Sequence, residues 1–166
     1  MNSKASSKTL LIADTGPLLA LARIAQLPLL KQLFGEVKVT HAVFSECQAK
    51  PERADAVAVQ AALDGGVFTL IANPVVTAKF SQLDLGEQTA LQTALTLKAS
   101  VLMDEAKGRK AAKANHIHVI GTIGILLLAK KRGLVAAVAP LLAALDASGY
   151  RLSPALIQQA KELANE

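Results

Sequence analysis

Short apolar runs alternate with amphipathic stretches along the chain. Each apolar run has four to six residues, the length of a strand that is buried on both faces. The stretches between them repeat apolar residues at three- and four-residue intervals, which is typical of helices that bury one face. We therefore predict five strands, over residues 9–13, 37–40, 67–72, 100–103 and 117–120.

Glycine and proline mark many of the predicted helix ends, because proline suits a first helical turn and glycine ends a helix. Helices are predicted after Gly16-Pro17, Pro28 and Gly86, from Thr122, and over residues 41–48, 54–63, 107–113, 135–147 and 154–164. Strands that alternate with helices form βαβ units with parallel strands. The predicted fold class is α/β, a three-layer sandwich with a central parallel sheet flanked by helices. A single domain is expected over residues 9–166, preceded by a flexible polar N-terminus at residues 1–8.

The composition indicates an aliphatic core and excludes several kinds of site. Hydrophobic residues make up 52% of the chain and aromatic residues only 3%, which disfavours a base-stacking platform for single strands. The one cysteine, Cys47, excludes a disulfide framework, a thiolate zinc cluster and a CxxC redox pair. The apolar run at residues 117–129 is shorter than the roughly 18 residues that span a bilayer. We expect a cytoplasmic protein that does not enter a membrane.

Four acidic residues stand where the predicted fold would bring them together. Asp14 and Asp104 each follow an apolar strand, and ligands of open parallel sheets bind beyond the strand ends. Glu46 and Glu87 lie on apolar helix stripes, where a carboxylate is costly unless it is paired, protonated or metal-bound. Converging carboxylates repel one another, and Mg²⁺ or Mn²⁺ would resolve this because both prefer carboxylate oxygens. Such an ion activates water for phosphodiester cleavage.

Each of these acids also has an ordinary structural explanation. An aspartate after a strand is a common helix cap, and a glutamate in a first helical turn complements the helix dipole. The net charge is +5, so if acids gather in one place the remaining surface is more basic than the total indicates. A basic remainder suits a polyanionic substrate. The residues alone leave both explanations open.

The order and spacing of these motifs resemble the PIN-domain ribonucleases. Leu-Leu-Ile-Ala-Asp14-Thr-Gly-Pro resembles the opening strand and turn of PIN domains. The next three acidic positions of PIN domains are resembled by three segments of this chain, Val-Phe-Ser-Glu46, Leu-Gly-Glu87 and Val-Leu-Met-Asp104. The later stretch Val-Ile-Gly-Thr-Ile-Gly-Ile-Leu is similar to a prokaryotic PIN-like branch related to VapC-type toxins. The resemblance extends from about Thr9 to the C-terminus.

The resemblance implies a metal-dependent endoribonuclease, the toxin half of a toxin–antitoxin pair with RNA as substrate and an antitoxin protein as partner. It implies catalytic residues that hold Mg²⁺ or Mn²⁺, namely Asp14, Glu46, Glu87 and Asp104. It also implies hydroxyl groups that orient a ligand, a water or the scissile phosphate, from Thr15 and Thr122.

Three basic residues and one further acid have two explanations each. By the resemblance the RNA backbone would contact Lys107, Arg109 and Lys110. A solvated helix face explains this basic trio equally well. Glu105 is either a fifth acid of the site or a cap of the following helix.

Two other functions share features with this sequence, besides the ribonuclease. Thr122 fills a position where many PIN toxins carry a further acid, and a hydroxyl is a weaker metal ligand, so a catalytically weak or inactive PIN module that binds RNA or a protein is the alternative. The complete acidic quartet favours the enzyme, because a binder of polyanions gains nothing from carboxylates in its cleft. A haloacid dehalogenase-type phosphatase is excluded, since that family needs a second Asp where this chain has Gly16.

The last two predicted helices carry apolar stripes beyond those that the sheet requires. The stripes consist of Leu141, Leu142 and Leu145 in one helix and Leu156, Ile157, Ala160 and Leu163 in the other. The mean hydropathy of +0.37 is also high for a monomer. Unburied apolar stripes mark interfaces, and PIN domains that resemble this one commonly form two-fold dimers. We expect a homodimer.

Overall fold

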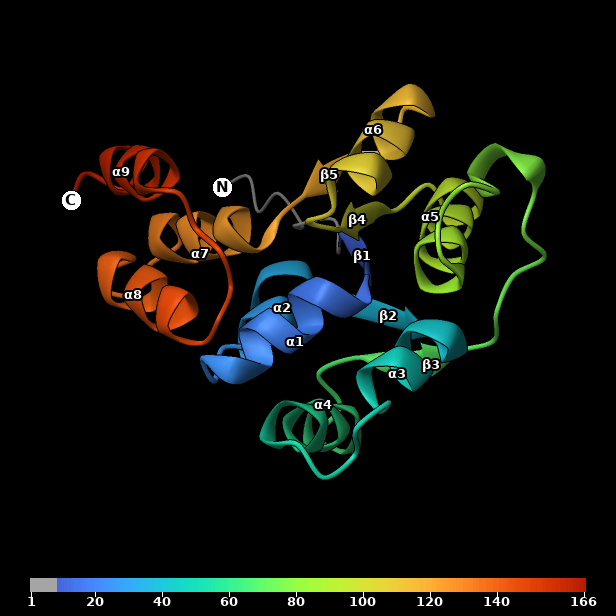
Figure 1. Ribbon diagram of the computed structural model, residues 1–166, viewed down its shortest axis with the longest axis horizontal. Helices are drawn as coiled ribbons and strands as arrows, with labels where there is room; N and C mark the ends of the chain where they lie inside the picture. The colour runs from blue at the N-terminus through green and yellow to red at the C-terminus, as the bar shows by residue number, and fades with distance from the viewer. Residues whose placement is uncertain (1–8) are drawn as a thin grey trace, which may run out of the picture.

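The central element of the fold is a parallel sheet, seen in a computed structural model that describes residues 9–166 (Figure 1). The expected flexible segment, residues 1–8, lies outside the described residues. The strand order is β3-β2-β1-β4-β5, and each neighbouring pair is parallel. The strands are β1 Leu10–Ala13, β2 Glu36–Thr40, β3 Thr69–Ile71, β4 Ser100–Leu102 and β5 Val119–Ile120.

Helices connect the strands and cover both sides of the sheet. In Figure 1, α2 and α7 lie on one side of it and α5 on the other. The helices are α1 Thr15–Arg23, α2 Pro28–Phe34, α3 His41–Cys47, α4 Ala54–Asp64, α5 Leu85–Leu97, α6 Ala106–Ala114, α7 Thr122–Lys131, α8 Ala139–Ala147 and α9 Pro154–Leu163, with a 3-10 turn η1 at Ala78–Phe80. This arrangement confirms the predicted α/β class with a parallel sheet between helices.

Several predicted boundaries were wrong. The strand predicted over residues 117–120 begins only at Val119. The strand predicted over residues 67–72 is shorter, and no local pattern predicted η1. Helix α5 begins before Gly86 and not after it, because Asp84 caps the helix and accepts a hydrogen bond from the Glu87 N–H at 2.8 Å. The helix predicted from Val135 begins only at Ala139.

The late start of α8 has one local and one distant cause. Pro140 lies in the first turn, where a helix tolerates proline. The Glu166 carboxylate accepts hydrogen bonds from the Val138 and Ala139 N–H groups at 2.7 and 3.0 Å. It also pairs with Lys130 Nζ at 2.8 Å. These bonds satisfy N–H groups that begin the helix and lack partners within it. Pro140 and the distant Glu166 therefore together define where α8 begins.

The core is aliphatic, as the composition predicted. Central strand residues such as Leu11, Ile12 and Val101 have no exposed surface. The α8 stripe also joins this core, since Leu142 and Leu145 are buried within the chain.

The burial of the α8 stripe leaves less exposed apolar surface for a homodimer interface than the sequence predicted. Helix α8 does not offer an unburied apolar stripe, contrary to the expectation from the sequence. Helix α9 still leaves Leu156 39% and Leu163 66% exposed. The homodimer stays a prediction, and among the predicted stripe residues the exposed leucines of α9 are its main remaining support.

None of the helices within residues 9–166 combines the length and the apolar character that crossing a membrane requires. The apolar run at residues 117–129 is divided between β5 and α7. The cytoplasmic location stays a prediction.

Candidate functional site

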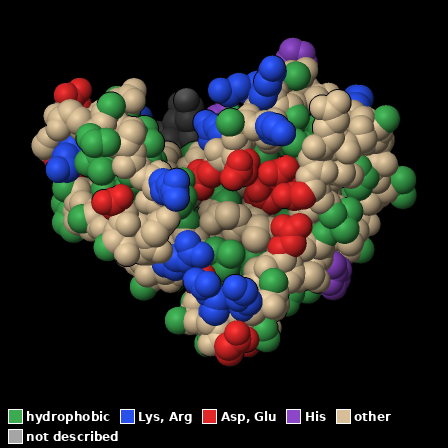
Figure 2. Space-filling view, in the orientation of Figure 1, with side chains coloured by type: hydrophobic (Ala, Val, Ile, Leu, Met, Phe, Trp, Pro, Cys, Tyr) green, Lys and Arg blue, Asp and Glu red, His purple; other side chains and the backbone are tan. Residues whose placement is uncertain are grey.

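The acidic residues that follow β1 and β4 lie at the same edge of the sheet. The two strands are neighbours with Ala13 opposite Leu102, and the Asp14 N–H donates to the Leu102 carbonyl at 3.0 Å. Asp14 and Asp104 therefore border one cavity, of about 420 Å³, together with Glu46 and Glu87. Figure 2 shows acidic side chains gathered in a hollow of this face, with basic side chains on either side. The cavity is also lined by Thr15, Gly16, Pro17, Leu19, Arg23, Asp84, Glu105, Gly149, Tyr150 and Arg151.

Asp14 is the most deeply placed acid of the cavity. Its side chain is 4% exposed, and within residues 9–166 its Oδ1 has no hydrogen-bond partner. Burial raises the pKa of Asp14 to about 7, with further increases from the charges of Glu87, Asp84 and Glu46, against a hydrogen bond from the Thr15 backbone that lowers it. A buried carboxylate oxygen without a partner is costly in free energy unless a proton or a cation binds it.

Glu46 is held at the cavity wall by two other segments. The Thr15 hydroxyl donates to Glu46 Oε2 at 2.6 Å, and the Gly86 N–H donates to Oε1 at 3.0 Å. Helix α5 approaches so closely that a Cβ built at Gly86 would lie 2.4 Å from Oε2. Gly86 is therefore the residue that lets the first turn of α5 hold this carboxylate.

Replacement of Gly86 by alanine is expected to displace Glu46. The added methyl group would overlap both carboxylate oxygens and its carbon, so the Glu46 side chain must turn away from Thr15 and Gly86. For the metal-dependent nuclease that the sequence resemblance implies, we expect this displacement to lower activity about tenfold or more, because it would remove the support of a predicted metal ligand. A rate assay beside a melting curve measures this. An alanine variant with wild-type activity would show that Glu46 need not lie where it does.

Glu87 and Asp84 hold each other at the start of α5. The Glu87 carboxylate accepts from the Asp84 N–H at 3.4 Å, and Asp84 accepts in return, which completes a capping box. Burial raises the pKa of Glu87, and so does the charge of Asp84. Glu87 is thus both a helix cap and a wall of the cavity. Sequence reasoning missed Asp84, although an acid three residues before Glu87 is the signal of such a box.

Asp104 is fixed by the start of α7. The Thr122 N–H donates to Asp104 Oδ1 at 2.8 Å, and the Thr122 hydroxyl donates to Oδ2 at 2.6 Å. Tyr150, between α8 and α9, lies against the same pair, and its pKa is raised by burial and by the charge of Asp104 and a hydrogen bond to it. Thr122 thus orients an acid of the cavity, and its predicted contact with a ligand stays a prediction.

Some predicted residues lie away from the cavity or point elsewhere. Lys107 and Lys110 are exposed on α6 and line a hollow beside η1 instead. Arg109 Nη1 donates to the Met103 carbonyl at 2.9 Å, which supports the end of β4. RNA contact by this trio stays a prediction. Glu105 lies at the N-cap position of α6 without a side-chain capping hydrogen bond, and it also lines the cavity, so both explanations of this residue stay open.

Cys47 lies behind the cavity and has no nucleophilic character. Its side chain is 3% exposed. Burial, reinforced by the charges of Asp14, Glu46 and Asp55, raises the pKa of the thiol to about 12. The thiol is therefore protonated at neutral pH and behaves as a small apolar group.

Sequence reasoning also missed Arg23, Tyr150 and Arg151, which complete the wall of the cavity. Arg23 ends α1, and the other two lie between α8 and α9. No local pattern distinguishes them from ordinary surface residues. Only the packing of distant segments brings them to the acids.

The chemistry of these residues fits a hard divalent cation. The acids offer only oxygen donors, and one oxygen of Asp14 is buried without a partner among residues 9–166. In the part of the chain that the structure describes, no three His, Cys, Asp or Glu side chains are so placed that they could hold an ion together. In this structure the oxygens of Glu46 and Asp104 accept hydrogen bonds from Thr15, Gly86 and Thr122 instead.

A protein-family model described as a PIN domain matches residues 10–166. The chain belongs to the PIN-domain family. This match confirms the resemblance found in the sequence, and it includes every acid of the cavity. PIN domains are generally nucleases, so the fold of this chain is a nuclease fold. No protein of curated function matches the chain.

Proposed function

We propose that this PIN domain is an endoribonuclease that depends on Mg²⁺ or Mn²⁺. The observation that carries the proposal is the buried Oδ1 of Asp14, which has no partner among residues 9–166 and lies in a cavity lined by other carboxylates. A cavity that only bound a polyanion would gain nothing from these charges. A divalent cation offsets the carboxylate charges, so a phosphate group can bind next to them.

In this proposal the ion is held by Asp14, Glu46, Glu87 and Asp104. When bound, it supplies an activated water and offsets the charge that develops on the phosphodiester. Asp14 contributes the oxygen that has no other partner in residues 9–166. Glu87, anchored by its capping box, adds a second deeply buried carboxylate.

The remaining polar groups of the cavity position these acids. Thr15 and the Gly86 N–H hold Glu46, and Thr122 holds Asp104 from both its backbone and its hydroxyl. Such hydrogen bonds orient ligating carboxylates and keep them from turning into solvent. Tyr150 covers the Asp104 side of the cavity and limits its access to water.

The physiological role that we propose is that of the toxin in a toxin–antitoxin pair, with an antitoxin protein as partner. Its support is the resemblance to VapC-type toxins, and its test is the neighbouring gene. A small DNA-binding protein encoded beside this chain is the expected finding.

The experiment that tests the nuclease is cleavage of RNA by the purified protein with Mn²⁺ and with EDTA. We expect internal cuts only with the metal, and none from Asp104→Asn purified in the same way, which controls for contaminating nucleases. RNA that is bound in Mn²⁺ but never cut would support the alternative, an inactive PIN module. One observation favours that alternative. Among residues 9–166, no three acidic side chains are so placed that they could hold an ion together.

A further inference from the structure

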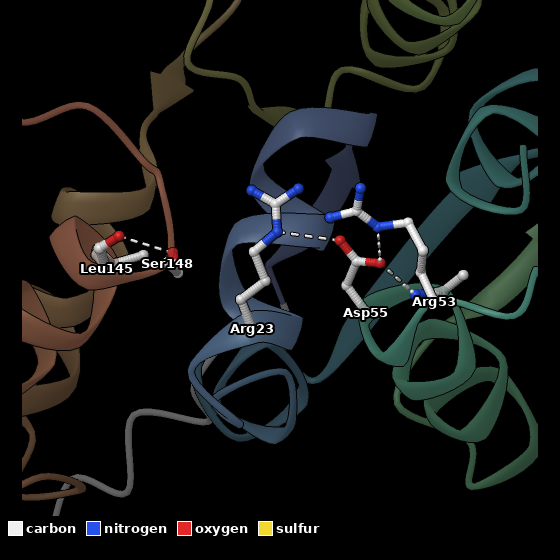
Figure 3. Close-up of polar contacts among 6 residues, drawn as sticks. Arg23, Arg53, Asp55, Leu145 and Ser148 are labelled. Carbon is white, nitrogen blue, oxygen red and sulfur yellow. Dashed lines mark hydrogen bonds and ion pairs between the residues drawn. The ribbon is translucent and has the colours of Figure 1, made fainter. Parts of the chain in front are cut away.

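Two arginines share one buried carboxylate beside the acidic cavity (Figure 3). Asp55, in the first turn of α4, is 6% exposed. Arg23 Nε from the end of α1 lies 3.0 Å from Asp55 Oδ2, and Arg53 Nε lies 3.5 Å from Oδ1. The Ala56 N–H also donates to Oδ1 at 2.9 Å. The carboxylate thus holds two guanidinium groups in place at once.

Charge and hydrogen bonding at this cluster are both left incomplete. Asp55 is the one carboxylate that the two guanidinium groups contact within residues 9–166, so it offsets only one of their two charges. Both arginines reach Asp55 through Nε, and within residues 9–166 their Nη groups donate to no oxygen. The Nη groups carry most of the donors of a guanidinium and match the oxygens of a phosphate. The side chains are 30% and 52% exposed, so an anion can reach them.

The arginine pair is continuous with the acidic cavity. Arg23 lines that cavity with Asp14, and it also lines the adjoining hollow with Glu46, Lys50 and Arg53. A second hollow of about 410 Å³ is bordered by both arginines and by Ser148 at the end of α8. Figure 2 shows basic side chains next to the acidic hollow on this face. A strand that left the acids on the side of Arg23 would pass the two guanidinium groups.

We propose that Arg23 and Arg53, held by Asp55, form a subsite for a backbone phosphate of the RNA strand, next to the phosphate that is cut. The inference rests on the proposed nuclease function. It supplies what the acidic cavity lacks, since carboxylates repel a polyanion and the charge of one bound ion extends only a short way. The pair fixes the position of the strand and does not read its sequence.

An ion pair that only stabilised the fold would need one arginine and not two. One arginine suffices to pair with Asp55, and Arg53 adds little, because a pair at 3.5 Å with a side chain 52% exposed is mostly solvated. The second arginine therefore adds little stability to the fold, and its guanidinium group can bind an anion.

Binding of a fluorescently labelled single-stranded RNA oligonucleotide in EDTA, followed by anisotropy over a range of salt concentrations, tests the subsite. We expect Arg23→Gln and Arg53→Gln each to weaken binding about tenfold. Each lost phosphate contact should lower the slope of log affinity against log salt by about 0.7. The Lys variants at the same positions keep the charge but lose the planar fork, and we expect an intermediate loss.

The matched control is Lys98→Gln, which removes the same charge from an exposed residue before β4, at the opposite end of the strand from Asp104. It should bind RNA as the wild type does. If Arg23→Gln does not fold, the Lys variant at position 23 and both Arg53 variants decide the question. Folded arginine variants that bind as tightly as Lys98→Gln, or a wild type that does not bind RNA, would overturn the subsite.

This experiment separates the two proposals because EDTA prevents cleavage. Unchanged binding in the arginine variants together with Mn²⁺-dependent cutting by the wild type would reject the subsite alone. RNA that is bound through the arginines but never cut in Mn²⁺ would reject the nuclease and leave the phosphate subsite standing.

Discussion

Asp14→Asn is expected to abolish RNA cleavage and to stabilise the fold at the same time. The asparagine keeps the shape of the side chain and removes a charge that is 4% exposed and faces other acids. Loss of this proposed metal ligand should lower kcat/KM by at least about 100-fold. A variant that cuts RNA at the wild-type rate would show that Asp14 does not bind the metal.

The gain in stability should depend on pH in a defined direction. The pKa of Asp14 is raised from 3.8 to about 7 in the folded chain, so the folded state binds its proton more tightly than the unfolded state does. The stability from this group is therefore fully present below about pH 4 and is lost as the pH rises to about 7. The asparagine does not titrate, so its advantage grows over that range to a few kcal/mol.

Thermal unfolding of the metal-free proteins between pH 4 and pH 8 measures this effect. Asp146→Asn is the matched control, because Asp146 is an exposed acid of α8 that does not line the cavity. We expect the melting temperatures of the wild type and Asp14→Asn to diverge with rising pH, and the control to follow the wild type. Parallel curves for all three proteins would contradict a raised pKa at Asp14.

The second large effect is stabilisation by metal. Mn²⁺ that binds only the folded chain should stabilise it by about 2.7 kcal/mol at a concentration one hundred times the dissociation constant. For a chain of this size that corresponds to a rise of roughly 5–10 °C in melting temperature. The rise should be larger at pH 8 than at pH 5, since the ion competes with the proton for Asp14.

Calorimetry or dye-based melting with and without Mn²⁺ tests this expectation. Asp14→Asn should lose most of the rise, whereas Asp146→Asn should keep it. An equal rise in the wild type and in Asp14→Asn would place the ion elsewhere on the surface. No rise in the wild type at any pH would favour a PIN module without a metal.

The sequence predicted the parts of the site that depend on strand ends. An acid directly after a buried parallel strand must lie at the carboxyl edge of the sheet, so Asp14 and Asp104 could be placed without coordinates. Glu46 and Glu87 could be assigned to inward helix faces for the same kind of reason, because an apolar stripe defines the face.

The remainder of the site depends on long-range packing. Asp55 holds Arg23 across 32 positions of the chain, and nothing near either residue signals the pair. Tyr150 reaches Asp104 from the loop between α8 and α9, and the start of α8 depends on Glu166. Such contacts follow from how whole elements pack, which periodicity along one segment cannot report.

The acidic cavity draws its walls from segments between Asp14 and Arg151. Part of the chain therefore cannot form it, however well that part folds. During synthesis the N-terminal strands emerge first and begin to fold while the C-terminal helices are still being made. The first acid exists early, yet the cavity closes only after Tyr150 and Arg151 have left the ribosome. The complete cavity is therefore a property of the chain folded as far as Arg151, and not of its N-terminal strands and helices alone.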